Sequence, residues 1–396
     1  MHLTRIFSAT GSTVSGIVLL ICIVDMLALA GDDQNLIETF AIATDGGPLM
    51  IPLHIKTEDS SFVLDTGAAI SVFDPAVAPA FNLTNRFAKV NGMPRLPVWR
   101  CRRAYLGHRN VPVLCRAVCI EMEDFGIACG REVRGILGIE FLRAQTHVVQ
   151  FDFDGGHVSF LKSSDGVAGE KIYLEFDPRN PDDCPSIAIE FPGVDRIPFV
   201  LDTGSVGAEV ATLSTATFNQ LLSAKQLSIA AGKARTLAIG GVIEGRSGFL
   251  KELRIGPFNR GDCLIREGAS DALGLGFLSR FKVTLDFAKH CVILDRGKRY
   301  SKSVPANRLG VDVEIKDGVG LFSEVEHNSV AFLCGIRPGD HLISVNDKPV
   351  GDMSCSDFAD FIHRAPNGSR MQIATPPSLE MREVQIDGAR AQYNRK

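Results

Sequence analysis

The stretch Phe62-Val-Leu-Asp-Thr-Gly67 occurs twice in this chain of 396 residues, and its second copy is Phe199-Val-Leu-Asp-Thr-Gly204. In each copy three apolar residues lead to a carboxylate, a hydroxyl and a glycine. An apolar run that ends in turn residues indicates a buried strand leading into a turn. A carboxylate in so apolar a setting costs free energy unless it is hydrogen-bonded or has a chemical role, so Asp65 and Asp202 are candidate functional residues.

The two hexapeptides belong to a longer repeat. Gly135-Ile-Leu-Gly138 follows the first copy, and Ala272-Leu-Gly274 follows the second at nearly the same spacing. A strand is predicted before each copy and a pair of strands after it. These segments are 50–55, 147–153 and 158–161 in the first half, and 187–191, 282–287 and 291–294 in the second. The same order of parts at matched spacing indicates an internal duplication.

These motifs resemble those of the aspartic proteases, in particular the retropepsin-like branch of the pepsin/retropepsin superfamily. The marks of that branch are an apolar-apolar-Asp-Thr-Gly strand and a downstream apolar-apolar-Gly, and both halves carry both. A single Asp-Thr-Gly is weak, because composition alone places one in roughly one chain in ten of this length. The resemblance implies a mostly β, bilobal acid-protease fold, with duplicated β-barrel lobes at 36–162 and 170–298.

The resemblance assigns catalysis to Asp65 and Asp202, one from each lobe. Two adjacent carboxyls share one proton, so that the charged member activates a water and the protonated member donates to the scissile carbonyl. The pair titrates as a unit, and neither residue is assigned as acid or base. The activity implied is that of an aspartic endopeptidase acting on polypeptide substrates, without a cofactor or metal.

The resemblance also assigns support of the two active-site loops to three kinds of residue. They are threonines that hydrogen-bond between the lobes, glycines that let backbone N–H groups approach the carboxylates, and glycines packed beneath the loops. In that order the pairs are Thr66 and Thr203, Gly67 and Gly204, and Gly138 and Gly274. After the second motif stands Ser205, whose hydroxyl is expected to hydrogen-bond the neighbouring carboxylate, and Glu209 is expected to face solvent.

Two hairpins are expected to close over the site. Asn-Gly favours a tight turn within Lys89-Val-Asn-Gly-Met93, and the second hairpin is expected near Ala238-Ile-Gly-Gly-Val242. The sequence after the second motif, Ser-Val-Gly-Ala-Glu-Val, departs from the Ala-Ala-Ile-Ser-Val-Phe of the first. The alternative function is therefore a catalytically inactive peptide-binding scaffold.

The C-terminal part has a different character. The run Gly335-Ile-Arg-Pro-Gly-Asp-His-Leu-Ile-Ser-Val-Asn346 resembles PDZ domains of exported bacterial proteases and implies an α+β PDZ domain at 306–390. By this resemblance Gly318, Val319, Gly320 and Leu321 form a loop that cradles a peptide C-terminus, and the next strand pairs with peptide C-termini or extended segments. Polar segments at 163–169 and 297–307 are expected to be linkers.

Composition excludes some functions. A net charge of −4 gives no reason to expect nucleic acid as a partner. Ten cysteines are present, nine of them after Ala30, but no Cys and His pattern has convincing metal-site spacing, and disulfide connectivity stays open.

The N-terminus is typical of an export signal over residues 1–30. Gly16 to Val24 is a run of small or apolar residues, and Ala28-Leu-Ala30 offers a small-residue cleavage site. The expected location is periplasmic or extracellular. The alternative is an uncleaved segment that anchors the protein to a membrane.

We expect cleavage after Ala30. N-terminal sequencing of the mature protein from its native host should begin at Gly31. An intact Met1 on membrane-bound protein would favour the anchor instead.

Overall fold

The computed structural model describes residues 35–42, 47–55, 58–90, 93–107, 111–123, 125–126, 132–146, 148–175, 183–207, 209–239, 241–301, 309–316, 318–325, 329–353, 357–358, 361–362, 366–378 and 380–386. The predicted export signal, Asn91-Gly92 of the first hairpin and Gly240 of the second lie outside these residues, as does most of the predicted linker at 297–307.

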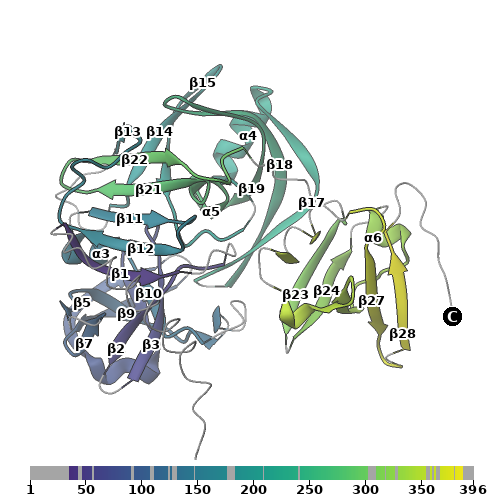
Figure 1. Cartoon of the computed structure of the whole chain (residues 1–396), viewed down its shortest axis with the longest axis horizontal. Coiled ribbons are helices and arrows are strands. Elements are labelled where there is room, and N and C mark those ends of the chain that lie inside the picture. The colour runs from purple at the N-terminus through teal and green to yellow at the C-terminus, as the bar shows by residue number, and fades with distance from the viewer. Residues whose placement is uncertain are drawn as a thin grey trace, which may run out of the picture.

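The protein is mostly β, with two half-barrel sheets followed by a C-terminal domain (Figure 1). The first half-barrel, hereafter the first lobe, has the strand order β5-β6-β9-β4-β10-β3-β2-β7-β8. Its strands are β2 (Met50–Ile55), β3 (Glu58–Leu64), β4 (Ser71–Phe73), β5 (Phe81–Lys89), β6 (Arg95–Cys101), β7 (Ala104–Leu106), β8 (Val111–Pro112), β9 (Arg116–Cys119) and β10 (Gly135–Leu137). The helical segments are η1 (Pro75–Ala80) and α3 (Ile139–Gln145).

The second half-barrel, the second lobe, repeats the central part of this arrangement in the order β14-β15-β20-β16-β19-β18-β17. Its strands are β14 (Ser186–Phe191), β15 (Val194–Leu201), β16 (Ala211–Ser214), β17 (Leu227–Ala238), β18 (Gly241–Ile255), β19 (Phe258–Gly268) and β20 (Ala272–Leu273). Its helices are α4 (Thr215–Ser223) and α5 (Leu275–Leu278). The strands β3-β10-β4-β9 correspond to β15-β20-β16-β19, which confirms the predicted repeat at the level of strand pairing.

A six-stranded sheet joins the lobes in the order β1-β12-β11-β21-β22-β13 (Figure 1). The predicted strand pairs are confirmed in it as β11 (Val148–Asp152) with β12 (His157–Leu161), and β21 (Phe281–Asp286) with β22 (Cys291–Arg296). The outer strands are β1 (Leu36–Ala41) and β13 (Glu170–Tyr173). Strands β11 and β21 pair at the centre, with Gln150 opposite Thr284, so each lobe contributes half of one continuous sheet.

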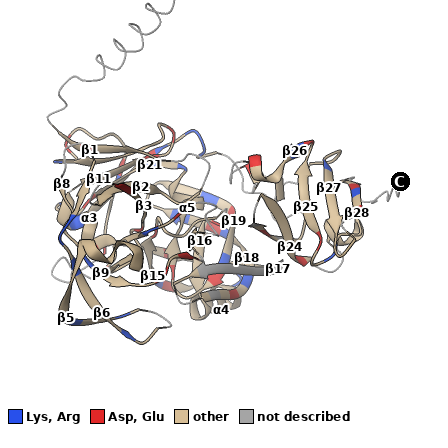
Figure 2. Cartoon of the chain, turned by 90° about the horizontal axis from the view of Figure 1, so that it is seen from below, with Lys and Arg blue, Asp and Glu red and all other residues tan. Residues whose placement is uncertain are grey.

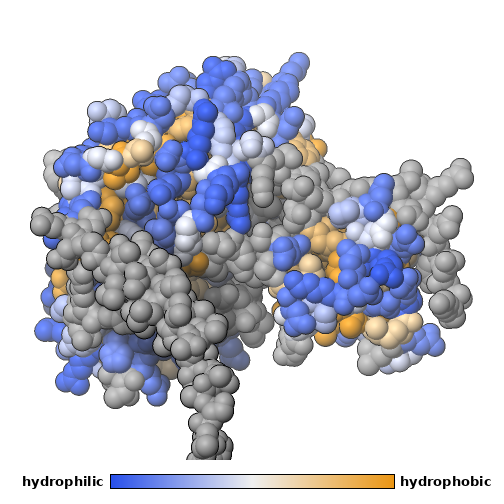
Figure 3. All heavy atoms as spheres, viewed as in Figure 1, coloured by the Kyte–Doolittle hydropathy of each residue, from blue (hydrophilic) through white to orange (hydrophobic). Residues whose placement is uncertain are grey.

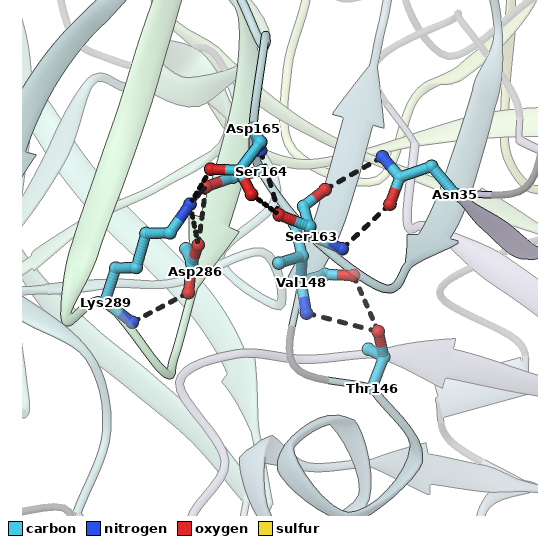
Figure 4. Close-up of polar contacts among 8 residues, drawn as sticks. All are labelled: Asn35, Thr146, Val148, Ser163, Ser164, Asp165, Asp286 and Lys289. Carbon is cyan, nitrogen blue, oxygen red and sulfur yellow. Dashed lines mark hydrogen bonds and ion pairs between the residues drawn. The ribbon is translucent and has the colours of Figure 1, made fainter.

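The segment predicted to link the lobes, at 163–169, is held in place by hydrogen bonds at its start (Figure 4). Asn35 and Ser163 exchange two hydrogen bonds, of 2.9 and 2.8 Å. Ser164 Oγ donates to Asp286 Oδ2 at 2.5 Å, and Lys289 Nζ lies 2.7 Å from Asp165 Oδ1. Because β1 on one side and the β21–β22 turn on the other hold this segment, it fixes the lobes rather than leaving them free to separate.

The C-terminal domain has its own sheet, in the order β23-β24-β25-β27-β28, with β26 paired to β25. The strands are β23 (Val311–Lys316), β24 (Val319–Val325), β25 (His341–Val345), β26 (Lys348–Pro349), β27 (Arg370–Thr375) and β28 (Glu380–Gln385). The described residues include the helical segments α6 (Val330–Leu333) and η2 (Val350–Asp352), and residues 357–358 and 361–362 are also helical. A separate apolar cluster that includes Phe322, Leu342 and Ile373 forms its core. Hydrophobic and hydrophilic residues both reach the surface of this domain in Figure 3.

Positively and negatively charged residues are interspersed along the chain in both parts (Figure 2). This mixture agrees with the small net charge of −4. Among the helices that the structure describes, none is both long and apolar enough to span a membrane.

Candidate active site

The two repeated hexapeptides occupy equivalent positions in the two lobes. Each begins on a buried strand that has a parallel partner. Leu64 of β3 pairs with Leu137 of β10, and Leu201 of β15 pairs with Leu273 of β20. The ladder continues one residue further in both lobes, where the backbone N–H of the aspartate donates to the carbonyl of the leucine on the partner strand. These bonds are 3.0 Å at Asp65 and 2.9 Å at Asp202.

The carboxyl groups of Asp65 and Asp202 lie close enough together for each to shift the pKa of the other. Each also accepts two backbone N–H groups of its own loop. Asp65 Oδ1 accepts from Gly67 at 2.8 Å and Ala68 at 3.1 Å, and Asp202 Oδ1 accepts from Gly204 at 2.9 Å and Ser205 at 3.0 Å.

The glycines of the motifs allow the two loops to meet. A Cβ atom on Gly67 would lie 2.5 Å from Cγ of Asp202, and one on Gly204 would lie 2.3 Å from Cγ of Asp65. Each glycine therefore faces the carboxyl of the opposite lobe, and any side chain there would push the pair apart.

The carboxyls are surrounded by protein but remain partly accessible to solvent. Burial raises the pKa of Asp65 well above its ordinary value, and the nearby charge of Asp202 raises this pKa further. Burial also raises the pKa of Asp202, while the neighbouring Asp65 and the hydrogen bonds from the loop N–H groups oppose that rise. The pair thus favours a state with one shared proton.

Thr66 and Thr203 lock the loops to each other across the lobes, and both are buried. Thr66 Oγ1 donates to the Leu201 carbonyl at 2.5 Å, and Thr203 Oγ1 donates to the Leu64 carbonyl at 2.8 Å. Each threonine N–H donates to the hydroxyl of the other at 3.0 Å. These four reciprocal bonds fix the separation of the aspartates, and they are the contacts expected of the two threonines.

Gly138 and Gly274 lie beneath the loops. A Cβ on Gly138 would lie 2.5 Å from the Ala68 carbonyl oxygen, and one on Gly274 would lie 2.7 Å from the Ser205 carbonyl oxygen. The following residues, Ile139 and Leu275, donate to these same carbonyls. The downstream glycines therefore let the chain pass close enough to brace each loop.

The expectation for Ser205 is wrong in its detail. The backbone N–H of Ser205, and not its hydroxyl, bonds Asp202; the hydroxyl accepts from Arg266 Nη2 at 2.9 Å. Glu209 does not simply face solvent either, since its Oε2 lies 3.8 Å from Arg266 Nη1. The sequence reasoning missed Arg266, which stands in the Cys-Leu-Ile-Arg-Glu run of β19.

Two hairpins stand where closing segments are expected. Strands β5 and β6 pair up to Lys89 and Arg95, and β17 and β18 pair up to Ala238 and Gly241. Ile239, at the tip of the second hairpin, packs against an apolar cluster of the first lobe that also contacts Ile70 and Val90. The second hairpin therefore reaches from its own lobe to the other.

The predicted carboxylate-binding loop at 318–321 is wrong. Gly318 occupies the tight turn between β23 and β24 with φ of +77°, and Val319, Gly320 and Leu321 belong to β24. Gly320 and Leu321 pair with β23 on one side and β25 on the other. Their backbone groups already form the sheet, so they do not cradle a peptide terminus.

Comparison with known proteins assigns the C-terminal domain. Residues 321–374 match the PDZ domain family, so this part of the chain is a PDZ domain, which implies binding of peptide segments. No curated protein matches the chain. Among the described residues no group of His, Cys, Asp and Glu side chains is placed to hold a metal ion.

Replacing Thr66 by Val should loosen the active-site loops. The change removes the bond to Leu201 and leaves the Thr203 N–H without its acceptor, at a cost of about 1–3 kcal/mol for each buried group. The melting temperature should fall by several degrees in calorimetry. Thr84→Val is the control, because Thr84 Oγ1 also donates to a carbonyl, at 2.6 Å, but within the first hairpin. Equal effects of both changes would contradict a special role for the interlobe bonds.

Proposed function

We propose that the two lobes form an aspartic endopeptidase. The observation that carries the proposal is the closely placed pair of carboxyls, Asp65 and Asp202, one from each lobe, held by the reciprocal bonds of Thr66 and Thr203. Two carboxyls that share a proton in a partly solvent-accessible site supply a general base and a general acid together.

In the proposed reaction the charged carboxyl takes a proton from a water molecule as the water attacks the peptide carbonyl. The protonated carboxyl donates its proton to the carbonyl oxygen, so the charge on the pair is unchanged as the tetrahedral species forms. On collapse the carboxyl that now holds the proton gives it to the leaving nitrogen, and the C–N bond breaks. The other carboxyl takes a proton from one hydroxyl of the tetrahedral species as the C=O bond re-forms, so the pair again holds one proton. The backbone N–H groups of Gly67 and Gly204 hold the carboxyls in place throughout.

The proposed substrate is an extended polypeptide segment between the lobes. The hairpins β5–β6 and β17–β18 would lie over it, and Ile239 would leave its contact with the first lobe when substrate enters. The supporting feature is that Val90 and Ile239, one from each hairpin, pack on the same apolar cluster as Ala68, which lies in the loop of Asp65.

The PDZ domain would dock such polypeptides outside the catalytic site. Strand β23 lies at the edge of its sheet and carries Ile315, which is 37% exposed. An extended peptide can add to an edge strand through its backbone, with neighbouring apolar side chains for contact. We propose β23 as that edge. We also propose an exported location, on the basis of the apolar run and cleavage site in residues 1–30.

Asp65→Asn and Asp202→Asn should each reduce peptide cleavage about 10²–10⁴-fold, because Asn keeps the shape of Asp but cannot hold the charge or share the proton. Cleavage of a quenched fluorescent peptide library would measure this, with circular dichroism to verify folding. The double variant should be little worse than either single variant, since the pair acts as a unit.

The same variants distinguish one chain from two. Mixing the single variants should not restore activity if one chain builds the whole site. Near wild-type turnover of Asp202→Asn beside an inactive Asp65→Asn would favour a dimer of first lobes. A wild-type protein that binds peptides but cleaves none would support the inactive scaffold.

Deletion of residues 305–396 should leave cleavage of a short generic peptide largely intact, because the PDZ domain has its own core. The deletion should weaken cleavage of a longer substrate that docks on the domain, seen as a higher KM with unchanged kcat. Equal loss for both substrates would show that the PDZ domain is a structural part of the catalytic unit.

A further inference from the structure

One buried position near the paired carboxyls is apolar in the first lobe and charged in the second. In the first lobe Val72 of β4 pairs with Val118 of β9, and in the second lobe Thr212 of β16 pairs with Arg266 of β19. Both pairs stand next to the strand that carries the downstream glycine, because Val72 also pairs with Ile136 and Thr212 with Ala272. Arg266 therefore occupies the position that Val118 holds in the first lobe.

The surroundings of the two positions match their residues: Val118 has apolar neighbours and Arg266 has polar ones. Val118 is completely buried in an apolar cluster with Val63 and Val72. Arg266 is almost as buried, with 7% of its surface exposed, and its guanidinium is always charged. Burying a charge costs free energy unless the charged group is hydrogen-bonded or paired.

The contacts of Arg266 lead to Asp202. Nη2 donates to Ser205 Oγ at 2.9 Å, Nε to Thr212 Oγ1 at 3.2 Å, and Nη1 to the Val206 carbonyl at 3.3 Å. Ser205 in turn donates its backbone N–H to Asp202 at 3.0 Å. Ser205 and Thr212 stand where the first lobe has Ala68 and Val72. The second lobe therefore has both the cation and the two hydroxyls that hydrogen-bond it.

We propose that Arg266 is a positioning residue that sets the charge state of the aspartate pair. Its positive charge favours the carboxylate of Asp202 over that of Asp65, so that the lobes are electrostatically unequal although their motifs are identical. The effect of Arg266 on catalysis rests on the proposed endopeptidase activity. Its effect on the ionisation of the two carboxyls concerns the protein without substrate and is measured separately.

The charged and titratable groups that the structure places around this contact are few. Asp65 lies beside Asp202, and Glu209 lies 3.8 Å from Arg266 and partly offsets its charge. The thiol of Cys184 contacts the Gly67 carbonyl at 3.4 Å in the opposite loop. Arg266 also lowers the pKa of Asp202, in opposition to burial, which agrees with this arrangement.

The test is the pH profile of kcat/KM for Arg266→Met. Loss of the cation disfavours the ionised forms of Asp65 and Asp202. The acidic limb and the basic limb of the bell-shaped profile should therefore both move to higher pH, by about 1 unit. Arg266→Lys keeps the charge and should leave the limbs near their wild-type positions even if it is less stable. Glu209→Gln removes the offsetting charge and should move the limbs to lower pH. Its outcome remains decisive if Arg266→Met does not fold.

Arg246→Met is the matched control. Arg246 bonds Glu267, the residue next to Arg266, at 2.8 Å, and successive residues of a strand face opposite sides of the sheet. It should not move either limb. Unmoved limbs in folded Arg266→Met, or an upward shift in Glu209→Gln, would overturn the proposal and leave Arg266 as a structural anchor of the loop.

A second measurement separates this proposal from the proposed activity. In full-length protein with ¹³C-labelled aspartate carboxyls, the resonances of the pair are those lost in Asp65→Asn and Asp202→Asn. Their first ionisation should move upward by about 1 pH unit in Arg266→Met, whether or not any peptide is cleaved. Absence of cleavage by the wild type would reject the endopeptidase, whereas absence of this shift would reject the role of Arg266.

Discussion

The structure between the lobes depends on holding two partly buried carboxyls, Asp65 and Asp202, close to each other. Burial and mutual repulsion both act against charge at this point, and the pair keeps its geometry because Thr66 and Thr203 bond each other's loops at four places. Each threonine hydroxyl both donates to a strand carbonyl and accepts a loop N–H. Both buried hydroxyls therefore donate and accept a hydrogen bond, and together these bonds fix the distance between the two loops and their orientation. The shared six-stranded sheet and the anchored segment at 163–165 support the same geometry from outside.

Much of this arrangement follows from the sequence. The apolar runs before Asp65 and Asp202 predicted buried strands, and the matched distance to Gly138 and Gly274 predicted that both lobes would brace their loops in the same way. The paired strands β11–β12 and β21–β22 were also predicted, because each is a short β-rich run with a turn between its halves. Such features depend on the local pattern of residues and on an internal repeat, and both can be recognised in the sequence alone.

Other features depend on contacts between distant segments, and these the sequence did not reveal. Arg266 stands within an alternating strand, where a charged residue ordinarily faces solvent, and only the pairing of β16 with β19 brings it under the Asp202 loop. The hydroxyl of Ser205 was expected on a carboxylate because the competing donor was not recognised. A Gly-x-Gly segment such as Gly318 to Gly320 fits a binding loop and a tight hairpin equally well, and only the pairing of β24 with β23 and β25 distinguishes the two.

Duplication explains why the two lobes could become unequal without losing the pair. In a symmetric dimer of identical lobes any substitution near one aspartate is repeated near the other, so a buried cation would act on both carboxyls alike and favour neither. Once both lobes are on one chain, Val118 can stay in an apolar cluster while the matching position becomes Arg266. The cost of that buried charge is then met by Ser205, Thr212 and Glu209, all within the second lobe. The first lobe keeps its apolar packing, including the contact with Ile239 from the opposite hairpin. Apolar packing on one side and a fixed charge on the other are thus available together only in the single-chain form.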